Sequence, residues 1–314
     1  MNTQNNFADS LINGLFGNVS ETVNADAVNT MLDKYGLNWR VEKTPLVLPS
    51  GVDTGFFGIV RTDTQKTFST CKDSYVPFQN SELAEMLHRI ADKTGYKIHS
   101  GGAFNGGGKV YLQLESPNKL QGIGQNNTTV NGYLTGLNSH DGTTSLKWGE
   151  VNFTVCCRNT FAAAVRTLQN KARHTNSIHD KVEAVIADLT GVVLQEKSLF
   201  DKFIKLSEVP ATRTNIAQVV KDITEVDILL TKDELKKNFS TYSLNRMEEL
   251  LQAISKEMAS KGQTLWGLFS GVTNYTSHTI PVPKRDNARL ESIYTGTAYD
   301  INNRAFNALE SFVN

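Results

Sequence analysis

A concentration of basic side chains between Val151 and Lys181 is the strongest chemical signal in the sequence. This stretch holds five basic residues and one acidic residue, Asp180, although the whole chain carries 32 of each kind and has no net charge. Lysines and arginines gathered without acidic neighbours are typical of a surface that binds phosphate groups. We therefore expect an anionic partner for this part of the chain, recognised by a local patch and not by the charge of the whole protein.

Residues 160–172 are predicted to form the helix that positions these charges. Apolar residues recur there at helical spacing. Arg166 and Arg173 lie seven positions apart, so their guanidinium groups would share one face about 10 Å apart. Arg158 precedes the predicted helix, where free backbone N–H groups also favour anions. The alternative is a solvated helix face, on which these cations form surface ion pairs or complement the helix dipole.

Nine residues follow as candidates for contacts with a nucleic acid. Basic side chains would hold phosphates, aromatic rings would stack on bases, and a histidine would form a hydrogen bond. The phosphate candidates are Arg158, Arg166, Lys171, Arg173, Lys147 and Lys109, the stacking candidates are Phe104 and Trp148, and the hydrogen-bonding candidate is His174.

No motif for catalysis or for a metal accompanies these residues. The glycine-rich segment 101–108 reads as a hairpin tip, because Lys109 and Val110 begin a strand, whereas a P-loop needs Lys-Ser or Lys-Thr and a following helix. The six histidines and three cysteines lack HExxH and zinc-site spacing, and no G-x-S-x-G is present. We expect no enzyme activity, cofactor or metal, and cysteines without a pairing pattern indicate a reducing compartment.

The hydrophobic pattern predicts the fold class α+β, in which a largely antiparallel sheet is followed by helices. Alternating apolar residues predict strands over most of 37–157, with a helix inserted at 82–93. Further turns are expected at Asp141-Gly142 and near Gly149-Glu150, and a loop is expected over 117–127. The later segments with helical spacing are 160–172, 177–207, 214–229, 243–261, 265–277 and 299–312.

Three regions are predicted along the chain. Residues 1–36 form an N-terminal helical arm, in which a helix over 25–34 is closed by Gly36. Residues 37–208 form the α+β domain with its basic helix 160–173, and residues 209–314 form a helical region that can also pack with that domain as one unit. The chain lacks an apolar run of about 18 residues and an apolar segment near its start. We therefore expect a cytoplasmic protein without a membrane span.

Eight short segments form a specific combination, in a fixed order. They are Arg61 to Thr64, Tyr75 to Glu82, Gly101 to Val110, Asn138 to Gly142, Cys157 to Phe161, Arg173 to Thr175, Thr264 to Gly267 and Val272 to Tyr275. Together they resemble a phage/plasmid-like family that is grouped only as a domain of unknown function, over about residues 37–309, with Phe78 where the family often has valine. The resemblance implies a protein of a phage, prophage or conjugative plasmid that acts in a bacterial cytoplasm, and it implies no catalytic residues.

These expectations combine into a non-enzymatic protein that binds single-stranded DNA, or RNA, and assists recombination or replication. Phage single-strand annealing proteins also contain a helix, strands with a tight hairpin and then a basic helix, which is an analogy of topology alone. The alternative is an interaction protein that binds and inhibits a host defence factor. A homo-oligomer and a host protein partner are further expectations.

Overall fold

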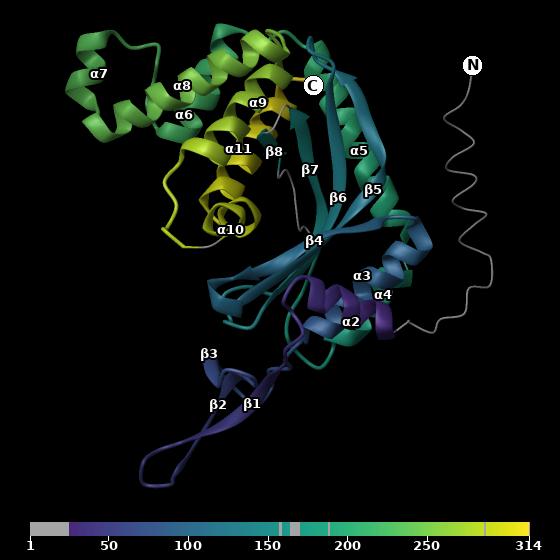
Figure 1. The fold of residues 1–314 in the computed structure, drawn as a ribbon. Coiled ribbons are helices and arrows are strands. Elements are labelled where there is room, and N and C mark those ends of the chain that lie inside the picture. Colours follow the sequence, from purple (N-terminus) through teal and green to yellow (C-terminus); the bar gives the residue numbers. More distant parts are fainter. Residues whose placement is uncertain (1–24, 157–158, 164–169, 188, 286, 314) are drawn as a thin grey trace. The chain divides into compact units, whose positions relative to one another are not determined.

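The computed structural model describes residues 25–156, 159–163, 170–187, 189–285 and 287–313. Antiparallel sheets occupy the N-terminal half and helices occupy most of the C-terminal half, which confirms the predicted α+β class (Figure 1). The described residues form two compact units. The first lies within 1–117, 134–149 and 168–192, and the second within 118–133, 150–167 and 193–314. The predicted regional limits at residues 36 and 208 stay a prediction.

A six-stranded and a three-stranded sheet provide the strands. The larger sheet has the order β4-β5-β6-β7-β8, with β9 paired to β7, and the smaller has the order β1-β2-β3. The smaller sheet contains β1 (Val41–Val47), β2 (Asp53–Arg61) and β3 (Lys66–Cys71). The larger sheet contains β4 (Lys97–Phe104), β5 (Lys109–Ile123), β6 (Thr128–Ser139), β7 (Leu146–Cys156), β8 (Asn159–Ala163) and β9 (Asn170–Ala172).

Helices α2 (Ala25–Lys34), α3 (Asn80–Thr94) and α4 (Ile178–Ala187) belong to the first unit. The limits of α2 are those predicted, and it buries one apolar stripe. A capping box between Gln79 and Glu82 starts α3, and Gly95 ends it in the left-handed conformation. Side chains from all three helices and from the adjoining strands form one apolar core.

Four predictions concern turns and loops between the strands, of which two are confirmed and two are wrong. The glycine-rich hairpin is confirmed, with Phe104 opposite Lys109, and Gly142 adopts a left-handed turn conformation between β6 and β7. The turn near Gly149-Glu150 is wrong, because β7 continues through it. The loop over 117–127 is also wrong, since β5 extends to Ile123. Pairing within the sheet keeps this polar segment extended, and sheet pairing is not visible in local hydrophobicity.

The predicted basic helix 160–172 is wrong at both ends that the structure describes. Residues 159–163 form β8, which pairs antiparallel with β7, and residues 170–172 form β9, which pairs with another part of β7. Apolar residues at every fourth position fit a helix when read alone. Here, backbone hydrogen bonds to β7 determine the local structure.

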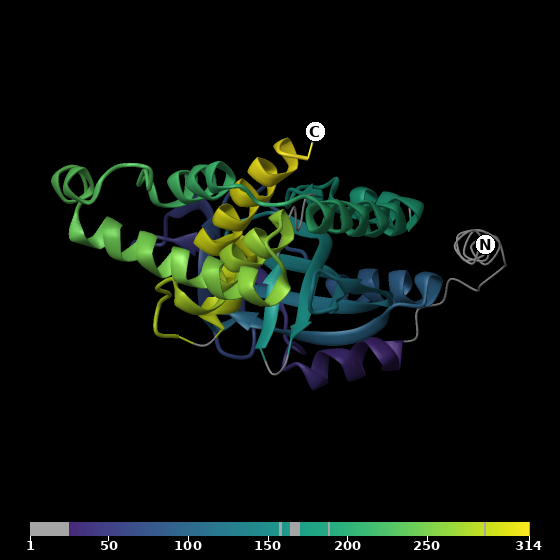
Figure 2. The same cartoon turned by 90° about the horizontal axis from the view of Figure 1, so that it is seen from above.

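The C-terminal helices follow the predicted spacing more closely. The long helix expected over 177–207 is two helices, α4 and α5, and the others begin or end within a few residues of the prediction, with α7 and α10 in addition. They are α5 (Leu189–Glu208), α6 (Arg213–Thr224), α7 (Lys232–Asn238), α8 (Thr241–Lys261), α9 (Leu265–Asn274), the π-helical η2 (Tyr275–Thr279), α10 (Ala288–Thr295) and α11 (Thr297–Ser311). Figure 2 shows the yellow-green α8 and α9 and the yellow α11 of the second unit from above.

Helices α8 and α9 approach each other closely because α9 carries glycines on the contact face. A Cβ atom at Gly271 would lie 2.4 Å from the Cα of Ile254, and one at Gly267 would lie 2.1 Å from the carbonyl oxygen of Gly262. Both obstacles are backbone atoms, which a change of rotamer cannot move. Glycine at these two positions therefore permits the close packing of the two helices.

We predict that Gly271→Ala destabilises the protein although alanine is the better helix former. The added methyl group would force α8 and α9 apart, and overpacking of this kind costs about 1–3 kcal/mol. The control is Ser270→Ala on the same helix, because the buried Ser270 hydroxyl has no hydrogen-bond partner among the described residues. Urea midpoints and melting temperatures measure both changes. A Gly271→Ala midpoint equal to that of wild type would contradict the packing argument.

Candidate nucleic-acid interface

Two lysines lie directly opposite each other where β9 pairs with β7. The register places Lys147 opposite Lys171 and Leu146 opposite Ala172. Opposed residues of an antiparallel pair project from the same face. Leu146, Trp148 and Ala172 are buried in the core of the first unit, so the two lysines project from the other face of this strand pair.

Arg173 adds a third cation immediately after β9, and its side chain is exposed. Within the part of the chain that the structure describes, no carboxylate lies within ion-pairing distance of Lys171 or Arg173. Two exposed cations, Lys171 and Arg173, therefore lie beside Lys147 on one strand pair, which makes it the best phosphate-binding candidate of the predicted residues.

The other three predicted phosphate-binding cations, Arg158, Arg166 and Lys109, are not part of this strand pair. Arg158 and Arg166 lie outside the described residues, so their predicted phosphate contacts stay a prediction. Lys109 is half-buried and its charge faces Asp141. Burial alone would raise the pKa of Asp141, but hydrogen bonds from Thr143 and Ser139 and the charge of Lys109 lower it. The positive charge of Lys109 is therefore partly compensated by Asp141, which weakens its attraction for an external phosphate.

The two predicted stacking residues cannot offer a ring to a base. Phe104 is 1% exposed and stacks on Tyr111, with ring centroids 5.0 Å apart. Trp148 is 4% exposed, because it alternates with Lys147 along β7 and points into the core. The prediction for these two aromatics is wrong for a physical reason, since stacking on a base requires an accessible ring face.

His140 stands at the centre of a buried polar network that joins several of the sequence motifs. The side chain of Asn80 donates hydrogen bonds to the carbonyl oxygens of Leu37 (3.0 Å) and Trp39 (3.2 Å), which fixes the orientation of its amide. The Asn80 oxygen then faces the Nε2 atom of His140 at 2.9 Å and must accept a hydrogen bond from its N–H group. His140 is therefore the Nε2–H tautomer and is neutral, and burial lowers its pKa to about 3.

The glycine-rich hairpin closes over this network. The backbone N–H groups of His140 and Asp141 donate to the carbonyl oxygen of Gly108, at 2.8 and 3.1 Å. Gly107 and Gly108 are buried, and a Cβ atom at Gly107 would press on Phe68 and Trp39. The motif at 101–109 thus shapes the protein interior, in addition to forming the predicted hairpin turn.

His174, the predicted hydrogen-bonding residue, contacts the same network through Tyr75, whose hydroxyl donates to the carbonyl oxygen of Ser139. Its ring stacks on Tyr75, with centroids 5.0 Å apart and planes 13° from parallel, and its carbonyl oxygen accepts the N–H of Val76. The side chain is 7% exposed, and neither ring nitrogen has a hydrogen-bond partner among the described residues. Burial lowers the pKa of His174 to about 4. A direct contact with a nucleic acid is not supported for a ring this deeply buried.

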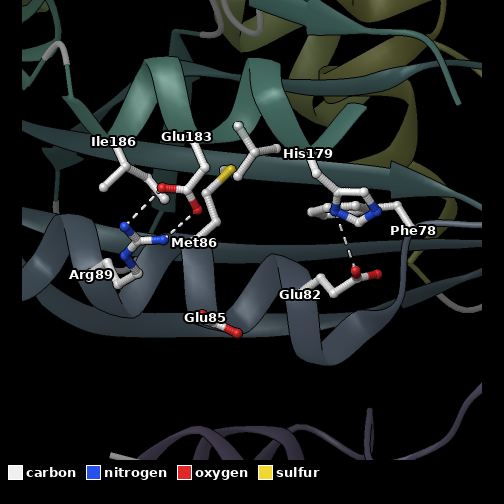
Figure 3. Close-up of a pocket in the computed structure, with 9 residues that line it drawn as sticks. Phe78, Glu82, Glu85, Met86, Arg89, His179, Glu183 and Ile186 are labelled. Atoms are coloured by element: carbon white, nitrogen blue, oxygen red, sulfur yellow. Dashed lines mark hydrogen bonds and ion pairs between the residues drawn. The ribbon is translucent and has the colours of Figure 1, made fainter. Parts of the chain in front are cut away.

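Figure 3 shows a small pocket between α3 and α4, with Phe78 and Met86 among its apolar lining. Arg89 donates to both carboxylate oxygens of Glu183, at 2.5 and 2.9 Å, and His179 lies 3.5 Å from Glu82 across the same groove. The ion pair lowers the pKa of Glu183. These contacts join α3 to α4, and the rim carries three carboxylates, Glu82, Glu85 and Glu183, beside one guanidinium group, that of Arg89.

Sequence reasoning missed the network residues Asn80, Tyr75 and Asn138. Each forms a hydrogen bond with a residue that is 60 or more positions away in the sequence. Asn138 donates to the carbonyl oxygen of Phe78 at 2.6 Å. The only available signal was that each lies in a motif with other polar residues in an otherwise apolar setting.

Among the described residues, no group of three or more His, Cys, Asp or Glu side chains is placed to hold a metal, and no helix combines the length and apolar character that a membrane crossing needs.

A family model covers most of this chain. The family model described as Domain of unknown function (DUF932) matches residues 67–297, which is more than half of the chain. No curated protein and no solved structure matches. The matched range contains Lys147, Lys171 and Arg173, and also Asn80, His140 and His174.

We predict that acid destabilises the protein through its two buried histidines. Both have pKa values below the ordinary 6.5, so the unfolded chain binds more protons than the folded chain between about pH 6.5 and 4. Stability is present above pH 6.5 and is lost as the pH falls, by up to about 1.4 kcal/mol per pH unit for each histidine.

His174→Phe tests this assignment because it keeps the stack on Tyr75 and removes a group that titrates. We expect stability at pH 7 to be retained and the pH dependence between 6.5 and 4 to become shallower by about one proton. Tyr75→Phe is the matched control, since it alters the same stack without removing a group that titrates in this range. Urea unfolding at several pH values measures both. An unchanged slope for His174→Phe would contradict the prediction.

Proposed function

The chain belongs to the DUF932 family of unknown function, and we propose that it is a non-enzymatic protein that binds single-stranded nucleic acid. It would be encoded by a phage or plasmid and would assist recombination or replication by holding strands for annealing. The phage or plasmid origin follows from the motif resemblance described above. The observation that supports the binding function is the opposed pair Lys147 and Lys171, with exposed Arg173 next to it.

The geometry of this pair suits a phosphate backbone. Opposed Cα atoms in an antiparallel pair lie roughly 4.5–5.5 Å apart, so two flexible ammonium groups can reach one phosphate or two adjacent ones. Lysine binds phosphate as a point charge without reading the base, whereas the planar guanidinium of Arg173 can donate two hydrogen bonds to one phosphate. Contacts of this type fix a strand without sequence preference, which is what an annealing protein requires.

The second candidate function, an interaction protein that inhibits a host defence factor, is favoured by a different observation. Four large apolar side chains are exposed near the tip of the β1–β2 hairpin, and exposed apolar clusters often mark protein interfaces. The two functions differ in their response to salt. Phosphate binding weakens steeply with ionic strength, while a mostly apolar protein interface does not.

We predict that Lys171→Gln/Arg173→Gln weakens binding to single-stranded DNA and flattens its dependence on salt. Each lost phosphate contact should reduce the slope of log affinity against log salt by about 0.7, so the double variant should be shallower by about 1.4. Both side chains are exposed, and exposed substitutions change stability by less than about 0.5 kcal/mol. Fluorescence anisotropy with a labelled oligonucleotide across a salt series gives affinity and slope.

The matched control is Lys236→Gln/Lys237→Gln on α7, which removes the same charge from the other unit. It should leave the slope close to that of wild type. If both double variants reduce the slope equally, the attraction is general and not located at β9. If the wild-type protein binds no single-stranded DNA at low salt, the proposed function is wrong and the interaction-protein candidate takes its place.

A further inference from the structure

The hairpin of β1 and β2 carries an unusual concentration of exposed apolar side chains. Among the described residues seven large apolar side chains are exposed, and four of them lie within ten positions, at Val47 (61%), Leu48 (51%), Val52 (57%) and Phe56 (45%). Figure 1 draws the two strands as a long twisted ribbon that ends in a free loop. Phe56 is the one aromatic ring in this group.

A β-bulge sets the direction of the Phe56 side chain. The pairing of β1 with β2 is regular from Val41 to Pro45 and shifts before Val47, which lies opposite Asp53. Gly55 within the shifted segment has a φ of +70°, a value that L side chains rarely adopt. Bulges of this kind redirect a side chain and are frequent beside functional sites. The next residue, Phe57, is half-buried under the ammonium group of Lys43, 4.6 Å from its ring centre, whereas Phe56 is exposed.

The base of the hairpin is held firmly by the His140 network. The Ser69 hydroxyl on β3 donates to the carbonyl oxygen of His140 at 3.0 Å. Arg61 at the end of β2 lies over the Trp39 ring at 4.2 Å, and it also forms a bidentate ion pair with Asp63. The exposed tip is therefore carried by a ribbon whose foot is fixed to the first unit, the unit that contains Lys147, Lys171 and Arg173.

The charge of the tip is compatible with a polyanion. Residues 44–60 contain one charged side chain, Asp53. One oxygen of its carboxylate accepts the backbone N–H of Gly55 at 2.9 Å, within the bulge. This hydrogen bond leaves the carboxylate charged, so the tip contributes one negative charge, and salt screens its repulsion of phosphates that lie beyond about 10 Å. Base–aromatic stacking needs one accessible ring face and tolerates any base.

We infer that Phe56 is the base-stacking residue of this protein, with Val47, Leu48 and Val52 forming an apolar rim around an unpaired base. The inference rests on the proposed function, in which Lys171 and Arg173 hold the phosphates of the same strand. It replaces Phe104 and Trp148, whose rings are buried. A single base matches the tip in size, because four half-exposed side chains offer on the order of a few hundred Å², whereas a protein interface buries about 800 Å² per partner and would need further surface beyond the tip.

The test compares Phe56→Ala with Phe56→Tyr and with Val52→Ala on an oligo-deoxythymidine strand and on an abasic strand of equal length. Phe56→Ala should weaken binding to oligo-deoxythymidine about 5- to 150-fold, equivalent to roughly 1–3 kcal/mol for one stacked base. Phe56→Tyr should retain wild-type affinity, and Val52→Ala, which removes rim surface but no ring, should have a much smaller effect. The salt slope should not change, because no phosphate contact is lost.

The abasic strand separates stacking from folding. It keeps every phosphate, so wild type and Phe56→Ala should bind it equally. A loss that is the same on both strands would mean that Phe56 acts on the protein structure, and would overturn the inference. Equal binding of oligo-deoxythymidine by wild type and Phe56→Ala would also overturn it, while the lysine contacts stand. Absence of binding by wild type to either strand would instead remove the proposed function, and a partner of the apolar tip would then be a protein.

Discussion

The hydrogen bond between Asn80 and His140 is the constraint on which the first unit depends. A buried amide and a buried imidazole are costly unless each finds partners. Asn80 resolves this by donating to two carbonyl oxygens from the segment before β1 and by accepting from the residue that follows β6. One side chain at the start of α3 thereby joins three distant parts of the chain. The hairpin foot, the glycine-rich turn and the Tyr75–His174 stack are all assembled around this junction.

The elements that the sequence predicts well are those with strong local chemistry. Helix α2 has an apolar stripe and a closing glycine, and α3 has a capping box and a left-handed Gly95, so each carries its own start and stop signals. The hairpin at 104–109 is likewise defined by the glycines within it. In contrast, residues 160–163 and 170–172 are strands only because β7 is beside them. Their apolar spacing fits a helix equally well, and no local signal separates the two.

The candidate site shows the same division between local and distant information. The sequence shows that this region is basic, because it contains Lys171 and Arg173. It does not show that Lys171 lies opposite Lys147, because this pairing depends on the register between β7 and β9. The burial of Trp148 follows from that same register, since strand residues alternate between faces. Phe56 was not predicted as a contact, although an aromatic pair after a glycine, in a segment with a single charged residue, gave a weak signal.

The division of each unit among three stretches of chain has a consequence for synthesis. Part of the core of the first unit, including Leu134, Leu146 and Ala172, lies in its second and third stretches. A ribosome must therefore add the 75 residues from 118 to 192 after the first stretch has been made, which takes about 4–15 s at roughly 5–20 residues per second. During that interval, the apolar faces of α2 and α3 lack part of their partners. These faces therefore stay exposed to solvent for longer than in a unit made of one continuous stretch, and cutting the gene at a single point cannot separate the two units.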